Sequence, residues 1–324
     1  MRILTLITVC LSFGSVYASD PLPSWNQGKA KQQVVQFVQH SIAVGGEKHI
    51  PVEQRIAVFD NDGTLWSEQP VYFQLYYAID RVKALAVEHP EWKSQQPFQA
   101  VIEGDKQALI ASGKEGLLKL VMATHAGMTT EEFSSSVREW LKTARHPQTN
   151  RPYTEMVYQP MLELLEYLRD NEFRTYIVSG GGIDFLRVWA EEAYGIPPHQ
   201  VFGSSVKVKY EERDGKPVLI RLPELNFIDD KAGKPVGIHQ FIGRIPVAAF
   251  GNSDGDFEML KWSARNPYSL QVLIHHTDAQ REWAYDRNSH IGKLDLAFDY
   301  ALKNQWSVVD MKNDWKVIFK SETK

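Results

Sequence analysis

Two aspartates stand two residues apart in the segment Asp60-Asn61-Asp62-Gly63-Thr64, directly after an apolar run at 55–59. A carboxylate can attack phosphorus and form an aspartyl-phosphate, which splits one difficult displacement into two easier ones. A second carboxylate nearby can move the protons of both steps. The plainer interpretation is an ordinary acidic turn, since Asp-Gly is a common turn pair. Taken alone, the pair predicts either a phosphoryl-transfer site or a loop.

A second polar segment, Ser179-Gly180-Gly181-Gly182, follows an apolar run at 174–178 and precedes a predicted helix over 183–194. Exposed backbone N–H groups at a helix start favour an anion. The alternative is a plain strand-to-helix turn. The segment is not a nucleophile elbow, because Ile177 stands where that motif has glycine. It therefore predicts an anion-binding loop rather than a serine nucleophile.

Further candidates lie in the second half of the chain. Lys234 stands at a predicted helix start, with Lys231 as its rival, although a lone lysine is usually a solvated surface residue. Asn252, Asp254 and Asp256 follow a third apolar run. Their oxygens suit Mg²⁺, which keeps several waters and takes few protein ligands. An acidic turn has the same composition, so these residues are weak signals when considered separately.

The elements that must position these residues alternate between strands and helices. Four apolar runs predict buried strands, at 55–59, 174–178, 245–250 and 270–274. Helical segments between them indicate a parallel sheet covered by helices on both faces. Ligands bind at the carboxyl ends of the strands in such sheets. The polar loops are therefore expected to meet, although they lie far apart in sequence.

The stretch from 67 to 160 interrupts this alternation with a helical pattern and no convincing strand. It predicts an all-helical cap inserted into an α/β core formed by 19–66 and 161–324. Between the second and third strands, 201–212 and 217–222 predict a hairpin that turns at Asp214-Gly215.

The first residues of the cap are candidates for contact with a substrate. Tyr72 and Tyr76 are four apart and are expected to share one helical face. That face lies either over the site, together with Glu68, or in the core of the cap. Phe73 points off this face and has no polar tip, so it is expected to be a core residue.

Four polar segments in this order resemble the motifs of the haloacid dehalogenase superfamily, in its phosphoserine-phosphatase-like branch with a helical cap. Asp60 to Thr64 is similar to the first motif, Ser179 to the second, Lys234 to the third and 251–256 to the fourth. The resemblance covers roughly residues 55–275. It implies a Rossmann-like sheet and a Mg²⁺-dependent phosphomonoester hydrolase that acts on a small phosphorylated substrate.

The resemblance also implies roles for single residues. Asp60 would be the nucleophile, and its other oxygen would bind Mg²⁺. Asp62 would be the general acid and base, and its backbone carbonyl would bind the metal. Ser179 and Lys234 would hold the phosphoryl oxygens, where charge develops in the transition state.

The same motifs place the remaining site residues. Thr64 would hold the loop and, with Gly180, border the substrate. Asn252 and Asp256 would be metal ligands, with Asp254 between them as a possible third. The family has an acid where Asn252 stands, so the sequence predicts that Asn252→Asp keeps activity and tightens Mg²⁺ binding.

Other functions remain as alternatives. Dehalogenase members of the superfamily need neither the second aspartate nor a metal, so Asp62 and the fourth motif favour phosphoryl chemistry. A phosphotransferase or mutase, or a relative that binds a phosphate ligand with little or no turnover, would carry the same motifs. The sequence does not identify the phosphomonoester or the oligomeric state.

The beginning of the chain predicts export. Arg2, an apolar stretch over 3–16 and small residues up to Ala18 are typical of a cleaved signal peptide spanning 1–18, which indicates a periplasmic location. Cys10 is the only cysteine, so the mature chain would have no disulfide. The formal charge of -4 provides no basic excess for nucleic acid. No later segment is apolar for long enough to span a membrane.

Three residues near the end of the fourth strand could be mistaken for a transition-metal cluster, namely His275, His276 and Asp278. Adjacent histidines on a strand point to opposite sides, which argues against a shared metal. One of the two is expected to approach the active site. The segment 306–319 predicts a closing strand and turn without an assigned function.

Overall fold

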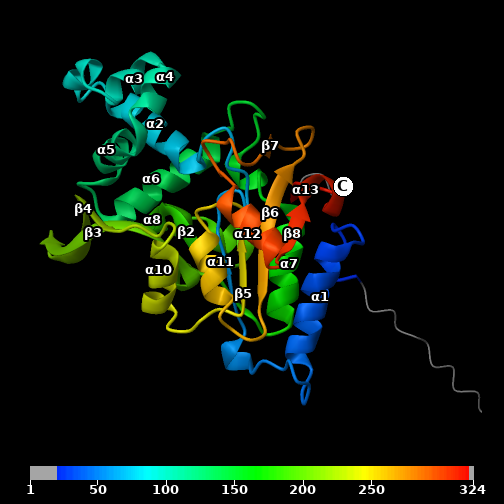
Figure 1. The fold of residues 1–324 in the computed structure, drawn as a ribbon. Helices are drawn as coiled ribbons and strands as arrows, with labels where there is room; N and C mark the ends of the chain where they lie inside the picture. Colours follow the sequence, from blue (N-terminus) through cyan, green and yellow to red (C-terminus); the bar gives the residue numbers. More distant parts are fainter. Residues whose placement is uncertain (1–19, 321–324) are drawn as a thin grey trace, which may run out of the picture.

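A computed structural model describes residues 20–320, and the predicted signal peptide at 1–18 lies outside the described residues. Its centre is a sheet with the strand order β4-β3-β2-β1-β5-β6-β7, in which β8 also pairs with β6 (Figure 1). Strand β4 pairs antiparallel with β3, and β7 pairs antiparallel with β6. The other strand pairs are parallel. The strands are β1 Ile56–Phe59, β2 Arg174–Gly182, β3 Val201–Arg213, β4 Lys216–Phe227, β5 Ala248–Gly251, β6 Leu270–Thr277, β7 Ala284–Tyr285 and β8 Ser307–Asp310.

Strand β1 is buried along its whole length because helices cover both faces of the sheet. Ala57 and Phe59 belong to one apolar cluster, whereas Ile56 and Val58 belong to another on the opposite face. The helices that contribute to the first cluster include α1 Lys29–Ile42 and α7 Gln159–Asp170; those of the second include α10 Gly233–Phe241, α11 Phe257–Ser263 and α12 Leu296–Lys303. The predicted α/β fold with a mainly parallel sheet is thus confirmed.

Between β1 and β2, a group of helices stands beyond the end of the sheet, at the upper left of Figure 1. These helices are α2 Phe73–Leu85, α3 Phe98–Glu103, α4 Lys106–Ala111, α5 Gly113–His125 and α6 Thr130–Thr143. The outer helices share a small apolar cluster of their own, built on Val82, Trp92, Val101 and Leu120. We refer to residues 67–160 as the cap.

The base of the cap is fastened to the β3–β4 hairpin through Arg221. Its Nε donates to the His125 carbonyl at 2.7 Å, and its guanidinium pairs with Asp184. Its own backbone exchanges hydrogen bonds with Gly127 and Met128, at 2.8 and 3.0 Å. The hairpin turns at Asp214-Gly215 as predicted, and it extends further than expected, since the two strands end only at Arg213 and Phe227.

Two local predictions were wrong. Strand β2 does not end at 178 but continues to Gly182, with a register shift against β3 between Ser179 and Gly182. The predicted helix over 183–194 is two short helices, α8 Ile183–Arg187 and α9 Ala190–Tyr194. Trp189 interrupts them with φ -134°, and its ring stacks on Trp66 at a centroid distance of 4.0 Å. Tertiary packing of this indole therefore overrides the helical pattern.

The closing segment contains β8 and the short helix α13 Met311–Asp314. Single turns of 3₁₀-helix occur at Val52–Gln54, Pro90–Ser94, Tyr153–Glu155 and Pro198–Gln200. Within residues 20–320, none of the helices combines the length and the apolar character that crossing a bilayer requires.

Candidate active site

The loop of residues 60–64, called the nucleophile loop after the role predicted for Asp60, leaves the carboxyl end of β1 and turns back at once. The Asn61 carbonyl accepts hydrogen bonds from the backbone of Leu65 at 2.8 Å and Thr64 at 3.2 Å. Gly63 adopts φ +74°, which favours glycine. A Cβ at this position would lie 2.0 Å from Asn252 Nδ2 and 2.4 Å from Glu68 Oε1. Glycine therefore allows two polar side chains to approach the loop.

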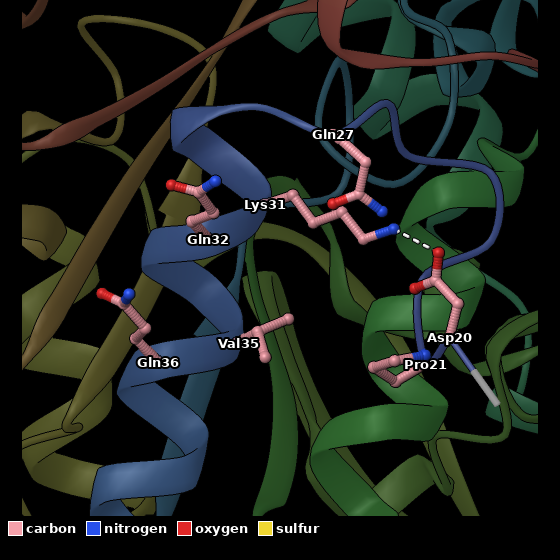
Figure 2. A pocket seen from close by; sticks show the side chains of 7 residues that line it. All are labelled: Asp20, Pro21, Gln27, Lys31, Gln32, Val35 and Gln36. Atoms are coloured by element: carbon pink, nitrogen blue, oxygen red, sulfur yellow. Dashed lines mark hydrogen bonds and ion pairs between the residues drawn. The ribbon is translucent and has the colours of Figure 1, made fainter. Parts of the chain in front are cut away.

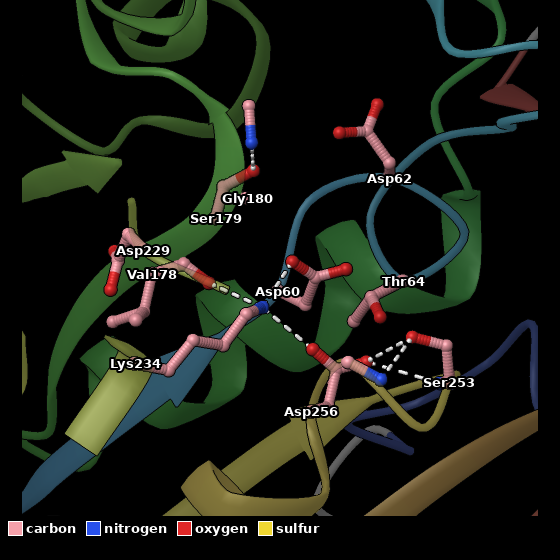
Figure 3. A network of polar contacts seen from close by, with 12 residues as sticks. Asp60, Asp62, Thr64, Val178, Ser179, Gly180, Asp229, Lys234, Ser253 and Asp256 are labelled. Carbon is pink, nitrogen blue, oxygen red and sulfur yellow. Dashed lines mark hydrogen bonds and ion pairs between the residues drawn. The ribbon is translucent and has the colours of Figure 1, made fainter. Parts of the chain in front are cut away.

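Lys234 connects Asp60 to strand β2 and to the loop after β5. Its side chain is buried, and Nζ donates to Asp60 Oδ1 at 2.6 Å, to Asp256 Oδ1 at 2.6 Å and to the Val178 carbonyl at 2.9 Å (Figure 3). Burial alone would lower the pKa of Lys234, but the carboxylates of Asp256 and Asp60 outweigh it and raise that pKa. The rival Lys231 is exposed and adopts φ +51° ahead of helix α10. Of the two lysines, the structure brings Lys234 to Asp60.

The two aspartates of the nucleophile loop differ in environment. Burial, followed by the charge of Asp256, raises the pKa of Asp60 well above its ordinary value, although Lys234 opposes this. Burial also raises the pKa of Asp62 to about 6, against the opposing effects of Trp66 and Lys234. Trp66 Nε1 donates to Asp62 Oδ1 at 2.8 Å and fixes that side chain. A carboxyl with a pKa near neutrality suits proton transfer in both directions.

The fourth motif follows β5, and its three polar residues have three different environments. Asp256 Oδ2 accepts from the backbone of Asn252 at 2.9 Å and of Ser253 at 3.0 Å, while Oδ1 is bound to Lys234. Asp254 Oδ1 accepts from the Asp295 and Ala297 amides, at 3.0 and 2.9 Å, at the start of helix α12. Asp254 thus holds α12, and Asp256 holds the loop and the lysine.

Asn252 is the residue of this motif that faces the nucleophile loop. Its Oδ1 accepts from Thr64 Oγ1 at 3.2 Å, and its Nδ2 donates to Glu68 Oε1 at 2.6 Å. Asn252 and Thr64 are both buried. Thr64 therefore fastens the nucleophile loop to the fourth motif, and in this structure its side chain is not open to a substrate.

The donors around Asp60 fit Mg²⁺ in chemistry. Asp60 and Asp256 pair with the ammonium group of Lys234, and the charges of Asp60 and Asp62 also act on the buried carboxyl of Glu68. Burial, followed by the charge of Asp62, raises the pKa of Glu68 well above its ordinary value. A cation would relieve this excess of negative charge. Within residues 20–320 no group of three or more His, Cys, Asp or Glu side chains is arranged around a metal position. Mg²⁺ needs fewer, since it is usually bound by one or two carboxylates, neutral oxygens and water.

The glycine loop, residues 179–182, lies beside the nucleophile loop. Ser179 is buried, and its Oγ accepts from the Gly181 amide at 3.0 Å (Figure 3). A Cβ at Gly181 would lie 3.3 Å from Ser179 Oγ and 3.6 Å from Asp62 Oδ2. Gly180 is exposed, and its carbonyl accepts from Ser204 Oγ at 2.8 Å. Ser179 and Asp62 thus flank the same short stretch of backbone.

A cap residue that the motifs did not indicate reaches this loop. Gln74 Oε1 accepts from the Gly182 amide at 2.7 Å, and its Nε2 lies 3.3 Å from Nε2 of the buried His125. Burial lowers the pKa of His125 to about 3, so its imidazole is neutral and accepts from the Gln74 amide. The cap is therefore tied to the glycine loop, and a glutamine at the start of a helix gave no signal of this role.

The predicted face of Tyr72 and Tyr76 does not exist, because α2 begins at Phe73 and Tyr72 precedes the helix. Burial, followed by the charges of Glu68, Asp62 and Asp60, raises the pKa of Tyr72 well above its ordinary value. Tyr76 packs on Tyr153 at a centroid distance of 5.9 Å. Phe73 is fully buried, as predicted for a core residue.

The end of strand β6 and the residues that follow it lie against the nucleophile loop. His276 Nε2 donates to the Gly63 carbonyl at 2.8 Å, and Nδ1 lies 3.1 Å from Glu282 Oε2. His275 is directed toward Asp286 instead, and Asp278 pairs with Arg281. One histidine thus approaches the site and the two histidines have different partners, as predicted. The sequence analysis did not find Glu282 or Tyr285, whose hydroxyl donates to Glu68 Oε1 at 2.8 Å, because no local pattern marks these two residues.

A separate open hollow beside α1 is lined by Asp20, Pro21, Gln27, Lys31, Gln32, Val35 and Gln36 (Figure 2). Lys31 is bonded there to Asp20 at 2.5 Å. None of these residues takes part in the network of Figure 3, so the hollow is distinct from the candidate site.

Comparison with known proteins agrees with this arrangement. The family model described as haloacid dehalogenase-like hydrolase matches residues 57–261, more than half of the chain. A comparison with curated proteins found no match.

Solved structures are similar at low sequence identity. A conserved functionally unknown protein from Anaerococcus prevotii DSM 20548 is 17% identical, with TM-score 0.58 over 90% of this chain and 94% of that one. A protein with unknown function from Bordetella pertussis Tohama I is 15% identical, with TM-score 0.49 over 80% of this chain and 99% of that one. A phosphoserine phosphohydrolase-like protein from Francisella tularensis subsp. tularensis SCHU S4 is 16% identical, with TM-score 0.39 over 68% and 87%. The first of these supports the fold.

Proposed function

Because this chain belongs to the haloacid dehalogenase-like hydrolases, we propose that it is a Mg²⁺-dependent phosphomonoester hydrolase with Asp60 as its nucleophile. The observation that carries the proposal is the contact of Lys234 with both Asp60 and Asp256, at 2.6 Å each, beside an Asp62 carboxyl whose pKa is about 6. Lys234 thereby orients the Asp60 carboxylate, and the Asp62 carboxyl is suited to proton transfer.

In the first step an oxygen of Asp60 attacks phosphorus as the bond to the leaving oxygen breaks. Asp62 donates its proton to that oxygen, and the alcohol leaves. In the second step water attacks the aspartyl-phosphate and gives a proton to Asp62, and the bond between Asp60 and phosphorus breaks. Inorganic phosphate is released, and both aspartates return to their starting states.

The surrounding residues have supporting roles in this proposal. The three N–H groups of Lys234 are directed at protein oxygens, so it orients Asp60 and supplies positive charge. The hydroxyl hydrogen of Ser179 and the Gly180 amide would meet the phosphoryl oxygens. Asp60, the Asp62 carbonyl and Asn252 would hold Mg²⁺, which supplies charge to the phosphoryl group when bound. Asp256 acts through Lys234 and the loop rather than as an open ligand.

The test is release of phosphate from a panel of phosphomonoesters, in Mg²⁺ and in a chelator. We expect turnover with Mg²⁺ only, and a phosphorylated peptide containing Asp60 after acid quenching. Binding of phosphate ligands without release would favour an inactive binding protein. Transfer of the phosphoryl group to a second substrate, without free phosphate, would favour a phosphotransferase or mutase.

We also propose that the protein is exported after cleavage behind Ala18. The support is the sequence of residues 1–18, with a basic start, an apolar stretch and small residues before the cut. Mass spectrometry of protein recovered from its native cells should find Ser19 as the first residue, in the periplasmic fraction. A mature chain that begins at Met1 would contradict export by this route.

A further inference from the structure

Glu68 is a buried acid at the border between the nucleophile loop and the cap. Its Oε1 accepts from Asn252 Nδ2 at 2.6 Å and from the Tyr285 hydroxyl at 2.8 Å. Two glycines make room for this oxygen, since a Cβ at Gly63 or Gly292 would lie 2.4 or 1.9 Å from it. Residues from three distant parts of the chain therefore hold one carboxylate against the loop that carries Asp60.

An asparagine amide has a donor end and an acceptor end, and its neighbours decide which end faces a site. Glu68 accepts only from the donor end, Nδ2, of Asn252. The acceptor end, Oδ1, is consequently directed to Thr64 and the nucleophile loop. With Glu68 in place, Asn252 offers an oxygen rather than an N–H group to a cation beside Asp60.

We propose that Glu68 is a positioning residue of the Mg²⁺ site: it turns the Asn252 oxygen toward the metal and supplies the negative charge that an aspartate at 252 would carry. This inference rests on the proposed function. A partner outside the ligand shell that fixes the orientation of a ligand typically changes metal affinity about 10- to 100-fold. In this protein the charge stands one side chain away from its usual position.

The contact reverses the expectation for Asn252→Asp. The new carboxylate oxygen would take the place of Nδ2, 2.6 Å from Glu68 Oε1. Two carboxylates at that distance must share a proton or move apart. The extra charge is then lost or the loop is displaced, so the single variant should bind Mg²⁺ no better than the natural chain.

A double variant that exchanges the acid and the amide between positions 68 and 252, called the swap, separates the roles of the two side chains. In the double variant Asn252→Asp with Glu68→Gln, the new amide at position 68 can donate to the new carboxylate at position 252, which restores the hydrogen bond in the opposite direction. The pair then has its original charge. Glu68→Gln alone keeps an acceptor for Asn252 Nδ2 but removes the charge, and it therefore tests the electrostatic part of the role.

The experiment is calorimetric titration of Mg²⁺ into metal-free protein for the natural chain, both single variants and the swap. We expect Glu68→Gln to weaken binding at least about tenfold, Asn252→Asp to give no gain, and the swap to bind more tightly than Glu68→Gln. The matched control is Glu163→Gln, another buried acid, which accepts from Ser24 at 2.5 and 2.8 Å remote from the site. It should leave Mg²⁺ binding unchanged.

Tighter binding in Asn252→Asp alone, or unchanged binding in Glu68→Gln, would overturn the inference. Should Asn252→Asp fail to fold by circular dichroism, the comparison of Glu68→Gln with the swap still decides, since an equal or weaker affinity in the swap rejects the coupling. If the natural chain binds no Mg²⁺, the proposed function fails. If it binds and turns over while Glu68→Gln does the same, only this inference fails.

Discussion

Different interactions stabilise the carboxyl edge of the sheet and the outer part of the cap. At the edge, Lys234 joins Asp60 and Asp256, which follow β1 and β5, to the Val178 carbonyl of β2, and Asp256 also binds the backbone of Asn252. The outer cap relies on a small apolar cluster, and helix α4 contains no buried residue at all. An edge fixed by long-range polar contacts suits chemistry that needs fixed geometry. A lightly packed cap can vary at low cost in stability, which suits the choice of substrate.

The largest expected effect comes from a substitution of Asp60, the proposed nucleophile. Asp60→Asn should abolish turnover, because a carboxamide is a poor nucleophile and the variant removes a charge from the metal site. The fold should survive, since Lys234 keeps Asp256 and the Val178 carbonyl as partners. Steady-state kinetics together with circular dichroism measure both. Activity close to that of the natural chain would exclude the covalent mechanism.

Much of this edge follows from the sequence, for a topological reason. Apolar runs followed by polar loops predict parallel strands, and parallel strands bring their carboxyl ends to one edge. Asp60, Ser179 and Asn252 could therefore be grouped before their contacts were known, whereas Lys234, which lies in helix α10, was assigned to them only by the family resemblance. Contacts outside these strands could not be predicted. Glu68 and Tyr285 are 217 residues apart, and the short strand β7, which carries Tyr285 and pairs with β6, brings them together.

Local conformation accounts for the remaining differences. The helical pattern at 72–76 does not reveal that α2 begins only at Phe73, which leaves Tyr72 outside the helix. Asp256 belongs to an acidic motif, but whether its oxygens face a cation or Lys234 depends on the backbone of the loop after β5.

A second change at the edge tests proton transfer. Asp62→Asn should lower kcat by about 10²–10⁴-fold, the usual contribution of a positioned general acid or base. Burial raises the pKa of Asp62 to about 6, so the natural chain should lose proton donation to the leaving group as pH rises through 6. This limb of the pH–rate profile should be absent in the variant. A profile that is the same in both chains would assign the proton to another group.

A substitution at the border between the sheet edge and the cap tests substrate choice separately from catalysis. Tyr72→Ala should change the ranking among phosphorylated substrates and spare a small aryl phosphate, because Tyr72 lies in the segment that joins the nucleophile loop to helix α2. Kinetics over the substrate panel measure the ranking. A uniform decrease with lowered thermal stability would instead make Tyr72 a packing residue.

The matched control is Phe73→Ala, one residue along the chain. Phe73 packs on Trp66 and Tyr153, at centroid distances of 4.7 and 4.6 Å, and is fully buried. Its removal should cost about 3–5 kcal/mol in the free energy of unfolding, as is usual for a buried phenylalanine. Any loss of activity should be uniform across substrates.

The last prediction concerns another buried carboxyl on which the charge of Lys234 acts, that of Asp229. Its carboxyl is fully buried, and within residues 20–320 neither oxygen has a hydrogen-bond partner. Burial raises the pKa of Asp229 to about 7, against the charge of Lys234. The folded chain therefore binds this proton more tightly than the unfolded chain does. The resulting stabilisation is complete below the ordinary pKa of an aspartate and is lost as pH rises through 7.

Asp229→Asn should remove this dependence, because an amide does not ionise. Relative to the natural chain, the variant should gain up to about 4 kcal/mol in the free energy of unfolding between pH 4 and pH 8. Urea unfolding in a chelator, at several pH values, measures this without a contribution from bound metal. Asp230→Asn is the control, since it removes the same charge from the adjacent, partly exposed residue. If both variants follow the natural chain at every pH, then ionisation of Asp229 does not change the free energy of unfolding, and its pKa in the folded chain is not raised.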